Sequence, residues 1–531
     1  MDISPTTLLN VLLGLILLSF LQRYSSTGKP STPLPPGPPP KPIIGNLRDL
    51  PSSGQQDWVH WLKHKDIYGP ISSLTVFGQT IVILNDSRIA FDLLEKRSNI
   101  YSSRPRMIFA GEMVGWEHIL AMQPYSDRFR AYRKAIHRVL GTKNSIAQFD
   151  YLQDMEVRRF LLRVLEKPRD LVKHIRTETG AVILKIAYGY NINPRGPDPF
   201  VSLANEALEN FSIAGTPGAW IVDAVPILQY LPSWLPGAGF KRTAAAWRDN
   251  LLTTIEKPYR LVLKQMKEGK YLDSYLSNLL EESHSQGRTL TAEEEQVITW
   301  SAGSLYTGGA DTTVSTLSTF FLAMSLYPAV QKKAQEELDT VLGPTKLPTF
   351  DDRPKLPYIE AIVKEALRWH PTAPMGIPHM CTEDDVYEGL KIPRGAVVMP
   401  NIWAFTHDPK TYPNPEIFDP TRFLPSTHAN SKEAQPDPHT LTFGFGRRIC
   451  PGRILADSTI FLSIAESLAV FNISPDREGS ARAEFLPGVI SHPVPFSLTI
   501  KPRSEEHEEL VRGVEVDFPF EESHMDDIDG I

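Results

Sequence analysis

The sequence predicts a mainly α-helical protein with small β-sheets, and three observations lead to this fold class. Most segments between Leu50 and Pro502 have a coarse helical pattern of apolar residues. The alternating segment ISSLTVFGQTIVILND, residues 71–86, predicts a β-hairpin, and a second short strand region is expected at residues 386–398. Neither an internal repeat nor a long linker divides this body. One folded unit is therefore expected, although 531 residues would ordinarily suggest several domains.

The composition is that of a globular protein, with 41% hydrophobic and 22% charged residues. The net charge of -7 is unevenly distributed, because residues 504–531 hold eleven acids and one arginine, a charge of -10. The remainder carries +3 and shows no clustered basic surface, so no nucleic-acid partner is expected. The acidic residues 503–531 are predicted to form a solvated, disordered tail.

Only two cysteines are present, Cys381 and Cys450, and neither belongs to a Cys-x-x-Cys pair. This count excludes a disulfide framework and disfavours a zinc site built on cysteine. The sequence assigns no role to Cys381.

The N-terminal residues 1–22 predict a transmembrane anchor. No charge occurs from Ile3 to Gln22, and twenty helical residues match the thickness of a bilayer core. A cleaved signal peptide is the alternative, but such peptides begin with basic residues. Here Asp2 comes first, and Arg23 and Lys29 follow the apolar run, which favours a cytoplasmic body. The proline-rich residues 23–49 are expected to form a stiff spacer, followed by the main domain at residues 50–502.

The clearest helix is expected to start after the capping box Thr291-x-x-Glu294 and to run about 36 residues, ending before Pro328. Its middle contains Gly308 and Gly309, each of which costs about 1 kcal/mol relative to alanine in a helix. Close packing of another backbone and a groove for a flat ligand both explain this pair.

Two polar constellations lie on otherwise apolar helices. Thr312 follows Gly308 by four residues, so its hydroxyl is expected to bond the Gly308 carbonyl and open the helix locally, with the carboxyl group of Asp311 beside it. Glu365 and Arg368 are neighbours at i, i+3, and Arg422 is a candidate third member of a buried ion trio.

The third constellation is the stretch FGFGRRICPG, from Phe443 to Gly452, where glycines and arginines surround the single thiol of Cys450. Together with GGADTT at 308–313 and Glu365-x-x-Arg368, this stretch resembles the cytochrome P-450 haem-thiolate monooxygenases. The resemblance covers the chain up to about Pro502. It implies a long central helix over the haem and a cysteine-ligand loop beneath it.

The resemblance implies a haem b cofactor with the Cys450 thiolate as its iron ligand. Dioxygen is expected in the groove at the glycine pair, and the catalytic residues are expected to be Asp311 and Thr312, which deliver protons. The expected haem-binding residues are Arg104, Arg133, Gly308, Gly309, His379, Phe443, Arg448, Cys450 and Gly452. A surface base and a satisfied loop histidine are the plainer interpretations of Arg104 and His379. Phe129 occupies the place of a tryptophan that the family uses as a donor.

The resemblance also implies partners and a location. These are dioxygen, an NADPH-dependent flavoprotein reductase and the endoplasmic reticulum membrane, crossed once by a monomer whose catalytic domain is cytoplasmic. Arg130, Lys134 and Arg138 form one basic stripe, either a solvated face or the reductase-docking surface. A small lipophilic substrate, such as a terpenoid or aromatic intermediate of secondary metabolism, suits the candidate pocket residues, although each is also explained by core packing. These are Phe109, Trp116, Phe211, Trp220, Ile377 and Val489.

Two other functions are alternatives. A haem-thiolate isomerase or dehydratase would act without a reductase, but such relatives typically lack the acid–alcohol pair that Asp311 and Thr312 form here. A non-enzymatic haem sensor is disfavoured because no fused signalling domain is visible. The identity of the substrate and the position of oxidation do not follow from the sequence.

Overall fold

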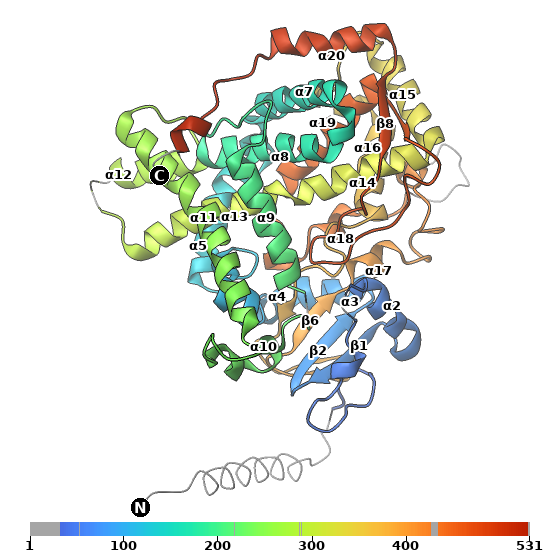
Figure 1. Ribbon diagram of the computed structural model, residues 1–531. Coiled ribbons are helices and arrows are strands. Elements are labelled where there is room, and N and C mark those ends of the chain that lie inside the picture. The colour runs from blue at the N-terminus through green and yellow to red at the C-terminus, as the bar shows by residue number, and fades with distance from the viewer. Residues whose placement is uncertain are drawn as a thin grey trace, which may run out of the picture.

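The computed structural model describes residues 32–52, 54–216, 218–285, 287, 289–425 and 434–528. Helices form most of the molecule, and the largest sheet lies at one end of it (Figure 1). The fold class that the sequence predicts, mainly α with small β-sheets, is confirmed. The longer helices are α2 (Asp57–Tyr68), α5 (Asp127–Leu140), α7 (Asp150–Glu166), α8 (Leu171–Tyr188), α9 (Pro199–Ala214), α11 (Gly239–Glu268), α12 (Tyr275–Ser285), α13 (Ala292–Ala310), α14 (Thr312–Leu326), α15 (Pro328–Leu342), α16 (Pro357–Trp369), α19 (Arg453–Val470) and α20 (Glu505–Asp517).

Short helices connect these elements. They are α3 (Ser87–Ala90), α4 (Ser98–Tyr101), α6 (Lys143–Ala147), α10 (Ile221–Ala224), α17 (Ile402–Thr406) and α18 (His439–Thr442). The strands are β1 (Ile71–Val76), β2 (Gln79–Leu84), β3 (His379–Met380), β4 (Asp385–Tyr387), β5 (Leu390–Ile392), β6 (Val397–Pro400), β7 (Phe471–Pro475) and β8 (Leu498–Pro502).

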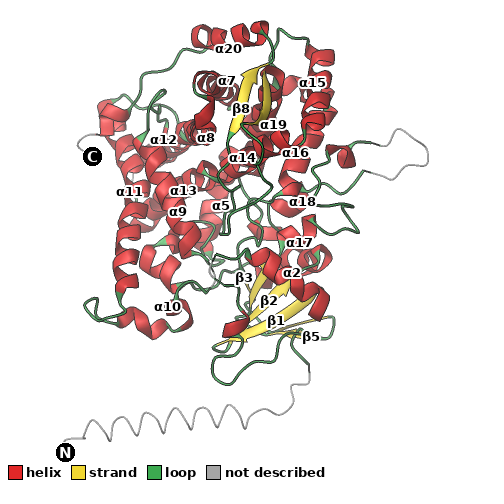
Figure 2. Ribbon diagram, turned by 45° about the vertical axis from the view of Figure 1, so that its right-hand side comes forward, coloured by secondary structure: helices red, strands yellow, loops and turns green. Residues whose placement is uncertain are grey.

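The strands form three small sheets (Figure 2). The largest has the order β1-β2-β6-β3, in which β1 and β2 form the antiparallel hairpin predicted from the alternating pattern. Its turn residues Phe77 and Gly78 both have positive φ, as the right-handed twist of a tight hairpin favours. The second predicted strand region is also confirmed, because β4, β5 and β6 lie within it or at its edges. This sheet supports the wall of the cavity described below.

The predicted central helix is present but divided in two. Its capping box is confirmed, since the Thr291 hydroxyl accepts the N–H of Glu294 and the Glu294 carboxylate accepts that of Thr291. The expectation of one continuous helix is wrong, because helical geometry is interrupted at Asp311, with φ -127°. The Thr312 hydroxyl donates to the Gly308 carbonyl at 2.8 Å, as expected for a side chain that competes within the turn. The two halves, α13 and α14, place this opened turn in the middle of the molecule.

The described part of the proline-rich segment is not a free spacer, so that prediction is wrong for residues 33–49. The N–H of Ser73 donates to the Pro36 carbonyl at 2.8 Å, and the N–H of Lys391 donates to the Pro33 carbonyl at 2.7 Å. Gly37 lies against the backbone of Ser73, where any Cβ would collide with the carbonyl oxygen. Prolines prevent this segment from forming a helix, but their free carbonyls let it add to the edge of the sheet. The predicted anchor at residues 1–22 lies outside the described residues.

The prediction of a disordered acidic tail is wrong for residues 504–528. Ser504 caps α20 by accepting the N–H of His507, and acidic residues in the first turn favour the positive end of the helix dipole. Val511 and Val514, three residues apart, are buried on the face of α20 that packs against α7. Charge density alone suggested a solvated tail. The segment is instead an ordered helix, because Val511 and Val514 give it an apolar face that packs against the core.

Beyond α20 the chain crosses the outside of α7 and α8 and reaches α11. Arg159 of α7 donates to the carbonyls of Phe518 and Pro519, and Lys185 of α8 pairs with Glu521 at 3.2 Å. Gln265 of α11 donates to Asp527 at 3.2 Å. Basic and polar groups of three core helices thus provide the partners that order the acidic segment.

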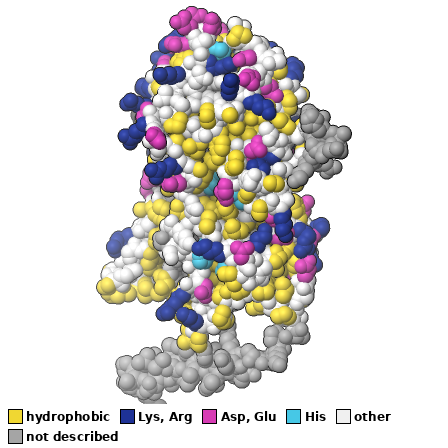
Figure 3. Space-filling model, turned by 90° about the vertical axis from the view of Figure 1, so that its right-hand side faces the viewer, with side chains coloured by type: hydrophobic (Ala, Val, Ile, Leu, Met, Phe, Trp, Pro, Cys, Tyr) yellow, Lys and Arg dark blue, Asp and Glu magenta, His cyan; other side chains and the backbone are white. Residues whose placement is uncertain are grey.

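An apolar segment lies at the surface between α9 and α11. Four of its large side chains are exposed, and α10 within it lies at the same end of the molecule as β1 and β2 (Figures 1 and 2). These four are Ile221, Ile227, Tyr230 and Trp234. On the face shown in Figure 3, Lys and Arg side chains are interspersed with Asp and Glu.

Within the described part of the chain, no single helix is both long and apolar enough to cross a membrane. One bent pair, residues 292–326 with Pro328–Leu342, meets these criteria by length and composition at an angle of 103°.

We expect Val511→Ala to lower the free energy of unfolding by about 1–3 kcal/mol, because it removes two buried methyl groups between α20 and α7. Val516→Ala is the matched control on the same helix, since Val516 is 81% exposed. Denaturant unfolding followed by circular dichroism measures both. Equal stabilities of the two variants would contradict the packing of α20 as a structural element.

Candidate functional site

A cavity of about 360 Å³ lies between the opened turn of the central helix and the loop before α19. Its lining is mostly apolar and comes from α5, α8, α9, α13, α14, α19 and several loops. The sequence-predicted residues that line it are Arg104, Trp116, Phe211, Arg133, Gly308, Gly309, Thr312, Ile377, His379, Phe443, Arg448, Cys450, Gly452 and Val489. The fold thus gathers residues that are up to 385 positions apart in the sequence around one space, as the numbering from 104 to 489 shows.

The Cys450 loop is shaped by glycines. Gly444 and Gly446 have positive φ, and a Cβ on Gly446 would collide with the carbonyl oxygen of Leu94. The N–H of Cys450 donates to the Phe443 carbonyl at 2.8 Å, which closes the loop on itself. Nothing lies within 4 Å of a Cβ placed on Gly452, so this backbone borders open space. The loop therefore presents a thiol at the cavity wall with little side-chain bulk beside it.

Burial raises the pKa of the Cys450 thiol, and it outweighs the opposing effects of the Gly452 amide, Arg133 and Arg453. The protein alone therefore favours the neutral thiol. A metal cation at the sulfur would reverse this preference, because coordination deprotonates a thiol. The chemistry of this donor fits an iron ligand.

Three arginines surround the same cavity and, within the described part of the chain, donate hydrogen bonds only to backbone carbonyls. Arg104 donates to Ala121, Ile377 and Pro378, Arg448 donates to Ser102, Leu120 and Gln123, and Arg133 donates to Ile449. Burial lowers the pKa of Arg104 well below its usual value and that of Arg448 to about 9. Buried cations without an acid among their described contacts are stabilised by an anionic ligand. The two carboxylates of haem fit this requirement.

Phe129 and His379 complete this side of the cavity. The guanidinium of Arg448 lies over the ring of Phe129 at 3.9 Å, so the residue in the tryptophan place supplies a cation–π contact instead of a hydrogen bond. Nδ1 of His379 bonds the Tyr101 carbonyl at 2.7 Å, and burial lowers the pKa of this histidine well below its usual value. His379 therefore donates to an anionic ligand only when it takes up a second proton, which a nearby anion would favour.

The two adjacent glycines of the central helix, Gly308 and Gly309, have different surroundings. A Cβ on Gly309 would lie 2.8 Å from Cγ1 of Ile183, so Gly309 permits the close approach of α8. A Cβ on Gly308 meets nothing within 4 Å, and Gly308 borders the cavity. Close packing thus accounts for Gly309, although the neighbour is the side chain of Ile183, and a groove for a flat ligand at Gly308 stays a prediction.

Asp311 points away from the cavity that Thr312 lines. Its Oδ2 lies 2.9 Å from Nε2 of His492, and its Oδ1 lies 4.0 Å from a guanidinium nitrogen of Arg176. The sequence did not reveal His492 or Arg176, because neither stands in a motif and both come from distant segments. The acid and the alcohol are adjacent in sequence but face different surroundings.

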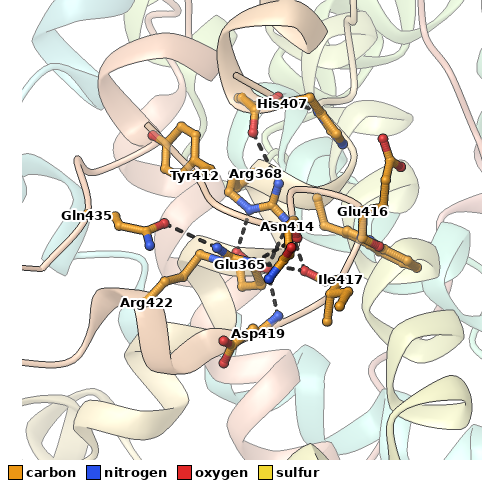
Figure 4. Close-up of polar contacts among 12 residues, drawn as sticks. Glu365, Arg368, His407, Tyr412, Asn414, Glu416, Ile417, Asp419, Arg422 and Gln435 are labelled. Carbon is orange, nitrogen blue, oxygen red and sulfur yellow. Dashed lines mark hydrogen bonds and ion pairs between the residues drawn. The ribbon is translucent and has the colours of Figure 1, made fainter. Parts of the chain in front are cut away.

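The buried ion trio predicted from the sequence is present (Figure 4). Glu365 accepts from Arg368 at 2.7 and 2.8 Å and from Arg422 at 3.2 Å. Both arginines also donate to the carbonyl of Ile417, and the N–H of Asp419 donates to Glu365 at 2.8 Å. Burial raises the pKa of Glu365 even though the two arginines oppose it. The trio therefore fixes the segment that leads toward the Cys450 loop.

Two of the predicted pocket residues do not reach the cavity. Phe109 and Trp220 stack on each other with ring centroids 3.5 Å apart, and Trp247 meets both edge-on. They form an aromatic cluster between α11, the helical segment Ile108–Val114 and the start of α10. Val182 and Ile183 of α8 line the cavity instead, and no sequence signal separates them from the other apolar residues of that helix.

A second charged cluster supports the start of the Cys450 loop. His439 of α18 pairs with Asp437 at 2.6 Å and with Asp457 of α19 at 2.9 Å, and Arg353 pairs with Asp457 at 2.7 Å. Burial lowers the pKa of His439, but the two carboxylates outweigh it and raise the pKa to about 9. The ring of His439 also stacks on Phe443. A protonated histidine therefore ties α19 to the first residue of the loop motif.

The family model described as Cytochrome P450 matches residues 35–500. The chain is 49% identical to cytochrome P450 monooxygenase claR of Ampulloclitocybe clavipes, over 96% of this chain and 93% of that one. It is 48% identical to cytochrome P450 monooxygenase ppsD of Aspergillus oryzae, over 93% of each chain. It is 43% identical to O-methylsterigmatocystin oxidoreductase of Aspergillus flavus, over 97% and 96%.

The raised pKa of His439 predicts a specific pH dependence of stability. The pKa of His439 is about 9 in the folded protein, against 6.5 for the free side chain. Its protonation therefore adds fully to the free energy of unfolding below pH 6.5, and this stabilisation is lost as the pH rises toward 9. We expect this contribution to reach at most about 3 kcal/mol.

Thermal unfolding at pH 6.5 and pH 9 measures the effect. The loss of stability at high pH is expected to be smaller in His439→Gln than in the unchanged protein. His284→Gln, at an exposed histidine of α12, is the control. An identical pH dependence in all three proteins would exclude the charged His439 cluster.

Proposed function

The chain belongs to the cytochrome P450 family and is a monooxygenase, and from this premise we propose that it oxidises a small lipophilic substrate with dioxygen and electrons from NADPH. The observation that carries the proposal is a buried thiol, Cys450, at the wall of an apolar cavity that the opened helix turn at Thr312 also borders. A thiolate ligand on haem iron favours cleavage of the O–O bond, which is the chemistry that the cofactor supplies when bound.

In this proposal the cofactor is haem b, and residues of this chain hold it. Cys450 would provide the iron ligand, and Arg104, Arg133 and Arg448 would neutralise the carboxylates. The backbones of Gly308 and Gly452 would approach the flat ring system, because neither position has a neighbouring atom within 4 Å of its missing Cβ. His379 and Phe443 would add contacts at the edge of the same space.

The catalytic work of the protein itself is proton delivery and exclusion of water. The Thr312 hydroxyl is fixed by its bond to the Gly308 carbonyl and stands at the cavity wall. It accepts a proton that Asp311 supplies and passes it to reduced dioxygen. The apolar walls keep bulk water from this step, so protons arrive through these two side chains.

The walls indicate the class of substrate. Trp116 and Phe211 form an aromatic pair with ring centroids 4.5 Å apart, and Ile377 and Val489 add aliphatic surface. Such a lining suits a terpenoid or aromatic compound that partitions into membranes. One relative is named as an oxidoreductase of O-methylsterigmatocystin, which supports an intermediate of fungal secondary metabolism.

The electron donor is proposed to be a separate NADPH-dependent flavoprotein reductase. Helix α5 links the cavity to the surface, because Arg133 lines the cavity while Arg130, Lys134 and Arg138 belong to its outer side. Two of these three bases already pair with acids, Arg130 with Asp127 and Arg138 with Glu282. Acidic groups of the reductase would replace Asp127 and Glu282 as the partners of these arginines. Docking would therefore weaken as the ionic strength rises.

The protein is proposed to act as a monomer at the cytoplasmic side of the endoplasmic reticulum membrane. The apolar run at residues 1–22 supports an anchor that crosses the membrane once. The exposed side chains at Ile221, Ile227, Tyr230 and Trp234 support contact of the body with the bilayer, since exposed aromatic and aliphatic groups favour the interface. Substrate would then enter from the lipid phase.

The first test is a carbon monoxide difference spectrum of dithionite-reduced membranes that carry the full-length protein. We expect the strongly red-shifted Soret band of a thiolate ligand. Cys450→Ala is expected to lose this band, whereas Cys381→Ala, at the buried second cysteine, is expected to keep it. A band at the ordinary haem position in folded, haem-loaded protein would contradict the proposal.

Thr312→Ala is expected to retain haem and to divert reducing equivalents to hydrogen peroxide, with a rise of about threefold or more in peroxide per NADPH. The cause is loss of the hydroxyl that passes protons into the cavity. Thr340→Ala is the matched control, because the Thr340 hydroxyl makes the same contact, with the carbonyl four residues earlier, on the exposed part of α15. Unchanged coupling in Thr312→Ala would remove the assigned role of Thr312.

A further inference from the structure

His492 lies outside the cavity wall, against the side of Asp311 that faces away from the cavity. We propose that His492 is a positioning residue through which Asp311 is resupplied with protons from solvent. The inference rests on the proposed role of Asp311 in proton delivery and adds the route by which this acid is recharged.

The geometry connects solvent to Asp311 in one step. Nε2 of His492 lies 2.9 Å from Oδ2 of Asp311, which is a direct hydrogen bond. The side chain of His492 is 21% exposed, whereas that of Asp311 is 10% exposed. Thr312, the next residue, lines the cavity. From the surface inward, the order is therefore His492, Asp311 and Thr312.

The loop that carries His492 is fastened to the opened central helix. The hydroxyl of Ser315 of α14 donates to the Ser491 carbonyl at 2.6 Å, and the N–H of Ser491 donates to the Thr372 carbonyl at 2.8 Å. The Ser491 hydroxyl bonds Nε2 of His370 at 2.8 Å, and Ser491 is fully buried. These contacts hold the backbone beside His492 in a single place. The pairing with Asp311 is therefore built into the fold and is not a chance surface contact.

Two other basic side chains surround this pair, and neither relays protons as well. Arg176 of α8 lies 4.0 Å from Asp311 and 3.6 Å from Glu209, but a guanidinium does not release its proton in proteins. Burial lowers the pKa of His370 well below its usual value, so His370 stays neutral behind Ser491. Among the described contacts of Asp311, the imidazole is the side chain whose ring nitrogen can both donate and accept a proton.

The proposed step conserves protons. A protonated His492 transfers the hydrogen on Nε2 to Oδ2 of Asp311, which leaves a neutral imidazole and a carboxylic acid. Neutralisation weakens the attraction of the carboxyl group to Arg176, so the side chain is free to turn toward Thr312 and pass on its proton. The imidazole then takes a replacement proton from water at its exposed edge. No electron is transferred in this exchange.

The contact itself is tested without turnover. Diethyl pyrocarbonate modifies exposed imidazole nitrogens, and peptide mass spectrometry measures its rate at His492 in the haem-loaded, full-length protein. We expect Asp311→Ala to raise that rate about threefold, because the hydrogen bond that protects Nε2 is lost. The rate at the exposed His284 of α12 is expected to stay the same. An unchanged rate at His492 would overturn the inference.

The proton route is tested by comparing His492→Gln with His492→Ala. Glutamine keeps an N–H donor at similar reach but carries no exchangeable charge. We expect both variants to keep the thiolate-type spectrum, to raise peroxide per NADPH about threefold and to increase the solvent deuterium isotope effect on turnover. Normal coupling in His492→Gln would overturn the inference, because a hydrogen bond alone would then suffice. His284→Gln is the control.

Asp311→Asn separates this inference from the proposed function. If Asp311→Asn uncouples and the double variant with His492→Gln is no worse, His492 acts through Asp311 as inferred. If Asp311→Asn uncouples while His492→Gln does not, only the inference about His492 fails. If Asp311→Asn itself leaves coupling unchanged, the assigned role of Asp311 fails and the inference fails with it.

Discussion

The paired charges of Glu365, Arg368 and Arg422 are the constraint on which the site depends. Glu365 and Arg368 are fully buried, so each would be costly without its partner. Loss of one member of a buried pair typically costs about 3–5 kcal/mol, because the remaining charge stays in a low-dielectric interior. The arginines also donate hydrogen bonds to the carbonyls of Pro413, Asn414 and Ile417. The trio therefore holds the backbone of residues 413–419 in place.

The second constraint is a set of three arginines that have no acidic partner within the described part of the chain. Arg104, Arg133 and Arg448 stand at the cavity with only carbonyl partners there, and Cys450 tends toward the neutral thiol. A ligand with two carboxylates and a metal cation would satisfy both features at once. Binding of such a ligand to the folded state alone would stabilise the fold by mass action. Binding of the proposed cofactor would thus be coupled to folding through these residues.

The opened turn of the central helix joins structure to chemistry. The helix is interrupted at Asp311, which faces His492 and Arg176 instead of the cavity, and the Thr312 hydroxyl beside the break donates to the Gly308 carbonyl. The buried acid thus contacts a partly exposed histidine outside the cavity, while the alcohol next to it in sequence lines the cavity. Because Gly309 has no Cβ, Ile183 of α8 packs closely against the central helix next to the break.

The sequence alone determined the elements whose signals are local. These include the hairpin of β1 and β2, the capping box at Thr291, the bond from Thr312 to Gly308, the pairing of Glu365 with Arg368, and the family of the chain through the Cys450 motif. Such features depend on neighbours within a few residues, so spacing is sufficient to predict them.

Only the tertiary structure decided which side chains meet across long separations. In the structure, Asp311 contacts His492. Phe109 and Trp220 stack on each other away from the cavity, and Val182 and Ile183 of α8 line the cavity wall. The tertiary structure also ordered the acidic C-terminal segment on α7, where Val511 is buried and Arg159 provides donors. The physical reason is the same in each case. Burial and ion pairing depend on which surfaces the fold brings together, and a one-dimensional pattern of apolar and charged residues does not contain that information.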